Sequence, residues 1–177
     1  KTYRPYNIAP PASGYDFLQG PLVKGLAGQD RNKNRIDDAV DFGIFDLKKA
    51  GPGKINLPMT SFIYFAAGGK YSDPPHTAAG AIQWYQMLRG LPPTPQGPPD
   101  PPQEVDPKTG QPTSFWLPGD PVTGGDPVKS SGWIDGLWDT PGDRRIMLTS
   151  GPFSMAIGDT QELVSATLAG LGSDRLS

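Results

Sequence analysis

The sequence predicts a mainly β fold with a sandwich-like core, one short helix and long irregular loops rich in proline and glycine. Two apolar segments, residues 146–149 and 163–168, have the character of strands, and strong turn signals separate them at Gly151-Pro152 and Gly158-Asp159. The 23 glycines and 22 prolines make up about a quarter of the 177 residues, while aromatic residues, at 10%, suffice for a packed core. We therefore expect a small β core that carries long loops.

The length fits one domain with a core of its own. Residues 1–15 are polar and rich in proline and aromatic residues, which predicts an extended N-terminal arm. Residues 16–177 then form a single β-rich domain. Within it, residues 91–113 form a proline-rich excursion.

Further strands are expected over residues 17–23, 42–47 and 60–67. The first is interrupted by Gly20-Pro21, and the last is rich in aromatic and β-branched residues, which favour strands. Residues 161–169 alternate with a period of two, but both of their faces carry apolar side chains. That pattern predicts a strand buried on both sides or near the centre of a sheet.

One helix is expected over residues 77–91, where apolar side chains recur at helical spacing. Asp73 is the expected N-cap, with Pro74 in the first turn, and Gly90 is the expected stop. The prolines of the excursion that follows lack amide donors, which predicts an extended, polyproline-like path. Two interpretations of this path stay open: a ligand or strap for a partner, and a solvated loop.

Composition excludes several function classes. A net charge of −2 provides no field that would recruit nucleic acid or an anionic membrane. The absence of cysteine removes disulfides, thiolate nucleophiles and zinc–cysteine sites. No run of about 18 apolar residues is present, so we expect no transmembrane segment.

A cluster of oxygen-bearing residues follows the ligand spacing of a calcium-binding loop. Its ligands would be Asp30, Asn32, Asn34, the backbone carbonyl of Ile36, Asp38 and Asp41. Arg35 stands where the turn prefers glycine, and Asp41 is shorter than the usual glutamate. Two interpretations therefore stay open: a calcium site, or a polar surface turn.

Three tryptophans lie in loop-like sequence and are candidate contacts for a partner or a glycan: Trp116, Trp133 and Trp138. Flat aromatic rings stack on sugars and bury large areas against proteins. The alternative is that these rings fill the core of a protein with little regular structure.

Acidic residues cluster around the same tryptophans, at Asp120, Asp126, Asp135, Asp139 and Asp143. Paired carboxylates could serve a glycosidase, but aspartate beside glycine and proline is also ordinary turn chemistry. We expect Asp143, Arg144 and Arg145 to form a structural ion pair where the next strand begins. The single histidine, His76, has no G-x-S-x-G motif to accompany it. The sequence thus predicts a protein that is not an enzyme.

Four motifs, in order along the chain, resemble an uncharacterised region of large secreted bacterial proteins, many of which end in a type IX secretion sorting domain. They are residues 14–21, 57–62, 118–124, and the GDRR…SGPF…GDTQE run over 142–162. The resemblance implies β-rich structure and an extracytoplasmic location: periplasm, cell surface or secreted. It implies no activity. Residues 156–164 also look like the turn and strand of immunoglobulin-like and fibronectin-like sandwiches, a likeness of fold alone.

These observations together predict a non-enzymatic, exported structural or interaction module. It would act as a peripheral accessory subunit whose partners are other proteins of an extracytoplasmic assembly. The alternative is a carbohydrate-binding module, with calcium as an optional cofactor. Proline-rich segments suit the first function because they lose little conformational entropy when they bind.

Overall fold

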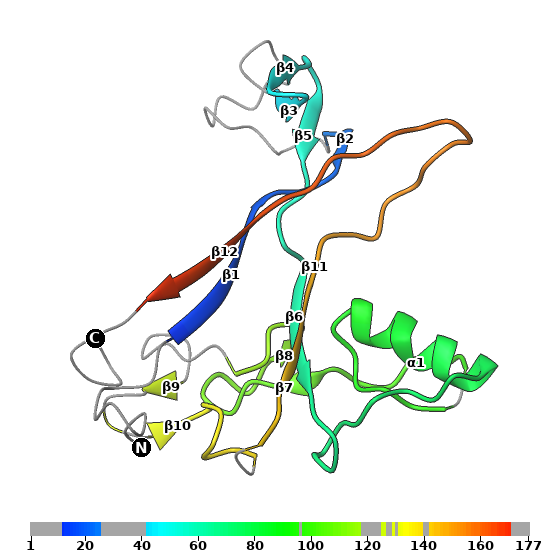
Figure 1. The fold of residues 1–177 in the computed structure, drawn as a ribbon. Helices are drawn as coiled ribbons and strands as arrows, with labels where there is room; N and C mark the ends of the chain where they lie inside the picture. Colours follow the sequence, from blue (N-terminus) through cyan, green and yellow to red (C-terminus); the bar gives the residue numbers. More distant parts are fainter. Residues whose placement is uncertain are drawn as a thin grey trace. The chain divides into compact units, whose positions relative to one another are not determined.

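The computed structural model describes residues 12–25, 42–95, 97–117, 125–126, 129, 131–139 and 142–170. Strands predominate there and one helix is present, as predicted (Figure 1). The elements are β1 Ala12–Gln19, β2 Leu22–Lys24, β3 Gly43–Phe45, β4 Lys48–Ala50, β5 Lys54–Asn56, β6 Ser61–Phe65, α1 Ala78–Leu88, β7 Glu104–Val105, β8 Pro112–Thr113, β9 Gly125–Asp126, β10 Ser131–Gly132, β11 Arg145–Thr149 and β12 Val164–Gly170. The described strands form two-stranded pairs, so a sandwich stays a prediction.

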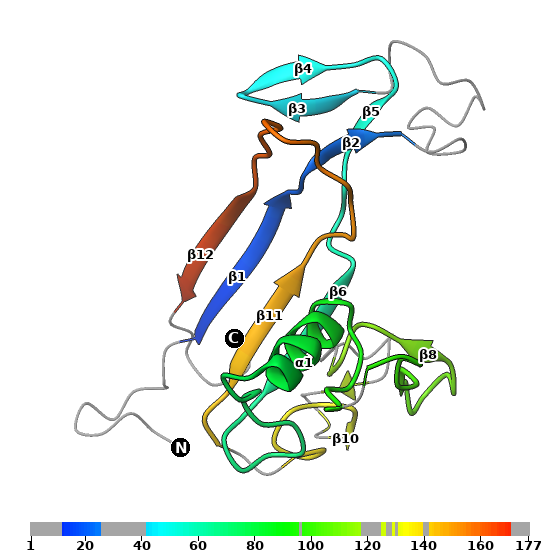
Figure 2. The same cartoon turned by 90° about the vertical axis from the view of Figure 1, so that its right-hand side faces the viewer.

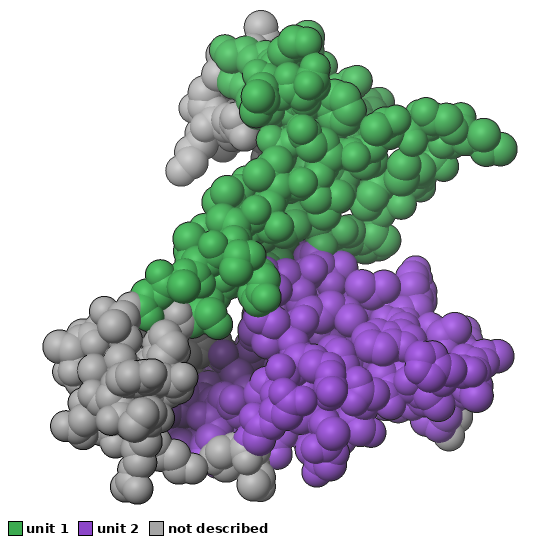
Figure 3. Space-filling model, viewed as in Figure 1, with its two compact units in different colours: residues 1–59, 150–177 green, residues 60–149 purple. Residues whose placement is uncertain are grey.

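The chain divides into two compact units, coloured separately in Figure 3. Unit 1 combines residues 1–59 with 150–177, and unit 2 comprises residues 60–149. The single domain expected over residues 16–177 stays a prediction. No helix in the described part of the chain is long and apolar enough to cross a membrane.

In unit 1, β1 and β12 form an antiparallel ribbon, seen side by side in Figures 1 and 2. The register runs from Ala12 opposite Gly170 to Gln19 opposite Val164, with a shift between Phe17 and Gln19. Residues 12–15, expected in the arm, therefore belong to a strand. The prediction that β12 is buried on both sides is wrong. Its side chains are half-buried or exposed, because it pairs with one strand instead of lying within a wider sheet.

The rest of unit 1 contains two short antiparallel pairs, β2 with β5 and β3 with β4. The side-chain amide of Asn56 joins them: its Oδ1 accepts from the Ile44 backbone N–H at 2.6 Å. Its Nδ2 donates to the carbonyl oxygens of Ile44 and Gly20, both at 2.9 Å. A Cβ at Gly20 would collide with the carbonyl oxygen of Leu57, so the close approach of these segments requires glycine.

In unit 2, β6 and β11 pair antiparallel, from Ser61 opposite Thr149 to Phe65 opposite Arg145. On its other side, β6 bonds the segment at 114–116: the Phe62 amide donates to the Ser114 carbonyl at 3.0 Å, and the Trp116 amide donates to the Phe62 carbonyl at 2.9 Å. Because β6 has neighbours on both edges, it lies at the centre of the core and supplies half of its buried members, which are Ile63, Tyr64, Phe65, Met87, Trp116 and Trp133.

Helix α1 begins one turn later than the expected cap would place it. Thr77 is the N-cap: it has extended dihedrals, and its side-chain oxygen accepts from the Gly80 N–H at 3.2 Å. Asp73, the expected cap, instead forms an ion pair with Arg145 at 3.0 Å. The expected stop is confirmed: Gly90 follows the C-cap with a φ of 72°, a conformation that favours glycine.

The proline-rich excursion contains more local structure than an extended path. The Thr94 amide donates to the buried Gln86 side chain at 2.7 Å, which holds the segment to the end of α1. Farther on, β7 and β8 form a short hairpin. Its turn is closed by Asp106, whose carboxylate accepts from the Lys108 N–H at 2.7 Å. A side-chain cap thus supplies the hydrogen bonding that the prolines cannot.

Candidate functional site

The predicted calcium ligands lie outside the described residues. Asp30, Asn32, Asn34, Ile36, Asp38 and Asp41 fall between the described segments that end at residue 25 and begin at residue 42. Within the described segments, histidine and acidic side chains form no cluster that could hold a metal ion. Calcium binding stays a prediction.

The three candidate tryptophans of unit 2 differ in exposure. Trp116 and Trp133 are 1% and 2% exposed and belong to the core, so neither ring is open to a glycan in this conformation. Trp138 is 48% exposed and meets Trp133 edge-on, with the ring centroids 6.1 Å apart. Trp138 is therefore the one of the three whose ring is substantially exposed, as stacking on a ligand requires.

A polar cluster lies beside the buried tryptophans of unit 2. The Glu104 carboxylate accepts from the Tyr71 hydroxyl and forms an ion pair with Lys70 at 2.6 Å. Burial and the hydrogen bond to Glu104 raise the pKa of Tyr71 to about 12. The space enclosed by these groups and Trp116 has no room for a water molecule. The cluster therefore stabilises the core and is not an open binding site.

The acidic residues near the tryptophans have partners that suggest structural roles. Asp135 pairs with Arg144 at 2.8 Å, and Asp139 accepts from the Tyr64 hydroxyl at 3.3 Å. The expected ion pair at the start of β11 is confirmed, between Asp143 and Arg145 at 3.4 Å. Burial, together with the charge and hydrogen bond of Asp139, raises the pKa of Tyr64 to about 12. Asp120 lies outside the described residues.

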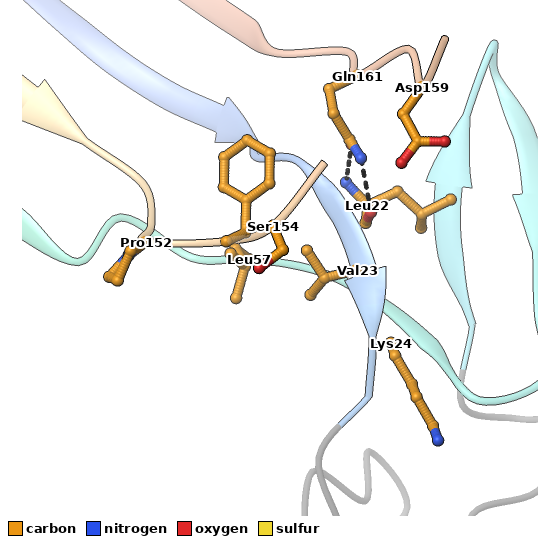
Figure 4. Close-up of a pocket in the computed structure, with 9 residues that line it drawn as sticks. Leu22, Val23, Lys24, Leu57, Pro152, Ser154, Asp159 and Gln161 are labelled. Atoms are coloured by element: carbon orange, nitrogen blue, oxygen red, sulfur yellow. Dashed lines mark hydrogen bonds between the residues drawn. The ribbon is translucent and has the colours of Figure 1, made fainter. Parts of the chain in front are cut away.

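Unit 1 contains a shallow groove of about 420 Å³, shown in Figure 4. Its apolar lining includes Val23, Leu57 and Phe153, and Asp159 and Gln161 lie on its polar side. The Asp159 carboxylate accepts from the Ala156 N–H at 2.7 Å, which closes a local turn. The Asp159 carboxylate thus serves the fold of the loop that forms a wall of the groove.

Residues of the sequence motifs at 57–62 and 142–162 form hydrogen bonds within unit 1. The Ser150 hydroxyl donates to the carbonyl oxygens of Leu57 and Pro58, at 3.3 and 2.9 Å. The Glu162 carboxylate accepts from Gln19 at 2.8 Å and from the Asp46 backbone N–H at 3.0 Å. These contacts join segments more than 90 residues apart in sequence, so the motif residues have a structural use.

The ribbon of β1 and β12, with its flanking residue Leu163, carries several exposed apolar side chains in unit 1. Four large side chains there are more than half exposed: Tyr15 at 57%, Leu18 at 59%, Leu163 at 59% and Leu168 at 55%. Among the described strands, neither member of the ribbon has a second neighbour. Unpaired strand edges and exposed apolar side chains are the features of an interaction surface.

Sequence reasoning missed this surface because apolar residues on both faces of a segment such as 161–169 ordinarily indicate burial. A signal was present in the size of the side chains. Alanine, serine and threonine make up much of β12, and such small side chains fill little core volume.

Comparison of the chain with protein-family models, curated proteins and solved structures finds no match.

Proposed function

We propose that this chain is a non-enzymatic structural module that binds other proteins of an extracytoplasmic assembly through the β1–β12 ribbon. The observation that carries the proposal is the exposure of Tyr15, Leu18, Leu163 and Leu168 on and beside a ribbon that no third described strand joins. The extracytoplasmic location rests on the resemblance of the motifs at residues 142–162 to secreted bacterial proteins.

The expected stability of the β1–β12 ribbon supports a partner that covers it. A two-stranded ribbon is marginally stable by itself in water and needs further strands or a packed face. Within the described part of unit 1, Ile55 is the one large aliphatic or aromatic side chain that is buried. Full burial of a leucine side chain contributes about 1.5–3 kcal/mol, so covering the exposed leucines would add substantially to stability. In this proposal, strands from the partner complete the sandwich-like core that the sequence predicts.

The acidic side chains near the tryptophans bond to other side chains of the fold, which supports a non-enzymatic role. Asp135, Asp139 and Asp143 bond to arginine or tyrosine side chains, as described above. His76 is exposed just before the N-cap of α1. Among the described contacts, none joins His76 to a nucleophilic side chain. Neither arrangement resembles a pair of catalytic groups held around a cavity.

The test is the native mass of the chain isolated gently from its source, with mass spectrometry of the proteins that accompany it. We expect stoichiometric partners, and protection of residues 12–19 and 164–170 from hydrogen exchange in their presence. Tyr15→Ser combined with Leu168→Ser should release the partners. Leu47→Ser, which alters an apolar side chain 91% exposed outside the ribbon, should retain them. A chain that travels alone, or partners that leave the ribbon unprotected, would overturn the proposal.

A second candidate, glycan binding, is favoured by the open ring of Trp138. It predicts binding to a member of a broad glycan panel that is lost in Trp138→Ala. Tyr85→Ala is the matched control, because Tyr85 is also exposed, at 57%, but lies on α1. Absence of binding across the panel, or equal loss in both variants, would remove this candidate.

A further inference from the structure

The outer edge of β12 lacks the features that usually keep an edge strand from pairing. Natural edges are blocked by charged side chains, prolines or bulges. The strand Val164–Gly170 has no charged residue and no proline, and its register with β1 is regular from Ser165 to Gly170. In contrast, β1 carries Asp16 and an irregular register between Phe17 and Gln19. Of the two edges of the ribbon, β12 therefore presents the one suited to accept a strand.

The sequence of β12 is complementary to itself when it is reversed. In an antiparallel pair centred on Thr167, that residue faces its own copy, and Ala166 faces Leu168. Farther out, Ser165 faces Ala169 and Val164 faces Gly170. Each large apolar side chain thus meets a small one, and the two central threonines meet each other. Cross-strand threonine pairs stabilise a sheet through hydrogen bonding, and no like charges face each other.

We propose that β12 pairs antiparallel with β12 of a second copy of this chain, across a two-fold axis at Thr167. The inference rests on the proposed function, because it names the first partner of the ribbon described there. An isologous contact of this kind uses one surface twice, which fits a strand whose pattern of side-chain size is the same in both directions.

The pairing joins two ribbons into a four-stranded sheet in the order β1–β12–β12–β1. A free-standing sheet needs at least three strands. A two-stranded ribbon falls short of this number, and the four-stranded sheet meets it. Residues directly opposite each other lie on one face, so Tyr15 and Thr167 of each copy share a face. Leu168 of each copy lies on the other face, beside Ala166 of the second copy. The open backbone groups of β12 are satisfied by the same contact.

A register-specific disulfide tests the proposal on the full chain, which contains no cysteine of its own. Thr167→Cys should form a covalent dimer under mild oxidation, because directly opposed residues of neighbouring strands lie within disulfide reach. Ser165→Cys should not, because two copies of residue 165 would lie four residues apart along the strands, or about 14 Å. The double variant Ser165→Cys with Ala169→Cys should crosslink again.

Charge provides an independent test at the same position. Thr167→Lys places two ammonium groups opposite each other and should convert the wild-type dimer, with a mass of twice 18.9 kDa, to a monomer. Thr167→Val, which retains β-propensity, should keep the dimer. Tyr15→Lys adds the same charge to the same face of β1 and should also keep it. Circular dichroism of each variant verifies that the strands are retained.

The outcomes separate this inference from the proposed function. A wild-type chain that is monomeric at all concentrations, yet joins other proteins through a protected ribbon, would overturn the second-copy inference and leave the proposed function in place. Dimers in which Ser165→Cys crosslinks as readily as Thr167→Cys would also overturn it, because the register would differ. A monomer that binds no protein at all would overturn both.

Discussion

The side-chain amide of Gln161 pairs with the backbone of Leu22 as a neighbouring strand would. The Leu22 N–H donates to Oε1 at 2.8 Å, and Nε2 donates to the Leu22 carbonyl oxygen at 3.1 Å (Figure 4). The two residues are 139 positions apart, so this contact links the loop before β12 to β2. One side chain thus satisfies both backbone groups of a strand residue on the side away from β5.

Replacement of Gln161 by leucine should destabilise this part of unit 1. The variant leaves the Leu22 amide and carbonyl without their partner, at a cost of about 1–3 kcal/mol. We expect faster hydrogen exchange of the Leu22 amide, measured by NMR. Thr160→Ala changes the exposed neighbouring side chain and is the control. Equal exchange rates in Gln161→Leu and the wild type would contradict this role for the amide.

Gly20→Ala should destabilise the chain, and Gly14→Ala should not. A Cβ at Gly20 meets the Leu57 carbonyl oxygen and lies 2.8 Å from the Ser150 hydroxyl, so the backbone must move. Overpacking of this kind costs about 1–3 kcal/mol. A Cβ at Gly14 meets no atom within 4 Å, and we expect a change within about 0.5 kcal/mol. Urea unfolding of the two variants measures the contrast, which a similar midpoint for both would refute.

Alkaline pH should weaken unit 2 through Tyr71. Its pKa rises from an ordinary value of 10.0 to about 12 in the folded chain, chiefly through burial and then through the bond to Glu104. The folded chain therefore holds the phenolic proton more tightly than the unfolded chain does. This contribution to stability is complete below pH 10 and is lost as the pH rises toward 12. The unfolding free energy, measured across that window, should fall.

Two tyrosine variants test the assignment of this pH dependence. Tyr71→Phe removes the titrating hydroxyl, so the decline between pH 10 and pH 12 should become shallower. Tyr15→Phe removes a hydroxyl from the exposed ribbon and should leave the wild-type profile unchanged. A profile in Tyr71→Phe as steep as that of the wild type would assign the dependence to other groups.

Calcium should raise the melting temperature if residues 30–41 form the predicted loop. The shift is expected because calcium binds the folded chain alone. At a calcium concentration 100 times the dissociation constant, this binding adds about 2.7 kcal/mol to the free energy of unfolding. Chelator should reverse the shift, and Asp30→Ala should abolish it. Asp46→Ala is the control, because that carboxylate pairs with the exposed Lys48. A melting temperature that neither calcium nor chelator changes would rule the site out.

Local patterns in the sequence predicted where several elements lie but not how they pair. The strands β6 and β11 and the helix α1 coincide with segments of clear periodicity bounded by turn residues. In contrast, Ala12 pairs with Gly170 across almost the whole chain, and no local pattern specifies such a partner. The N-cap was misplaced because Asp73-Pro74 has the composition of a helix start, while the extended dihedrals of Thr77 depend on the fold around it.

The candidate sites were predictable to a smaller extent. The residue type of Trp116 and Trp138 is the same, but one ring is buried and the other is open, a difference set by contacts distant in sequence. The structural use of Gln161 and Glu162 was also invisible, because each bonds a strand in the other half of the chain. The predicted calcium ligands fall outside the described residues and remain as the sequence presents them.

The proline-rich excursion is held at defined points, and this has a practical consequence. Thr94 is bonded to Gln86, and Glu104 is bonded to Lys70 and Tyr71, whereas the turn at 107–110 is exposed. Extra residues inserted at that tip would lengthen the chain without loosening either attachment. An epitope or a fluorescent label placed there would therefore provide a handle for binding experiments while the strands of the proposed interface stay unaltered.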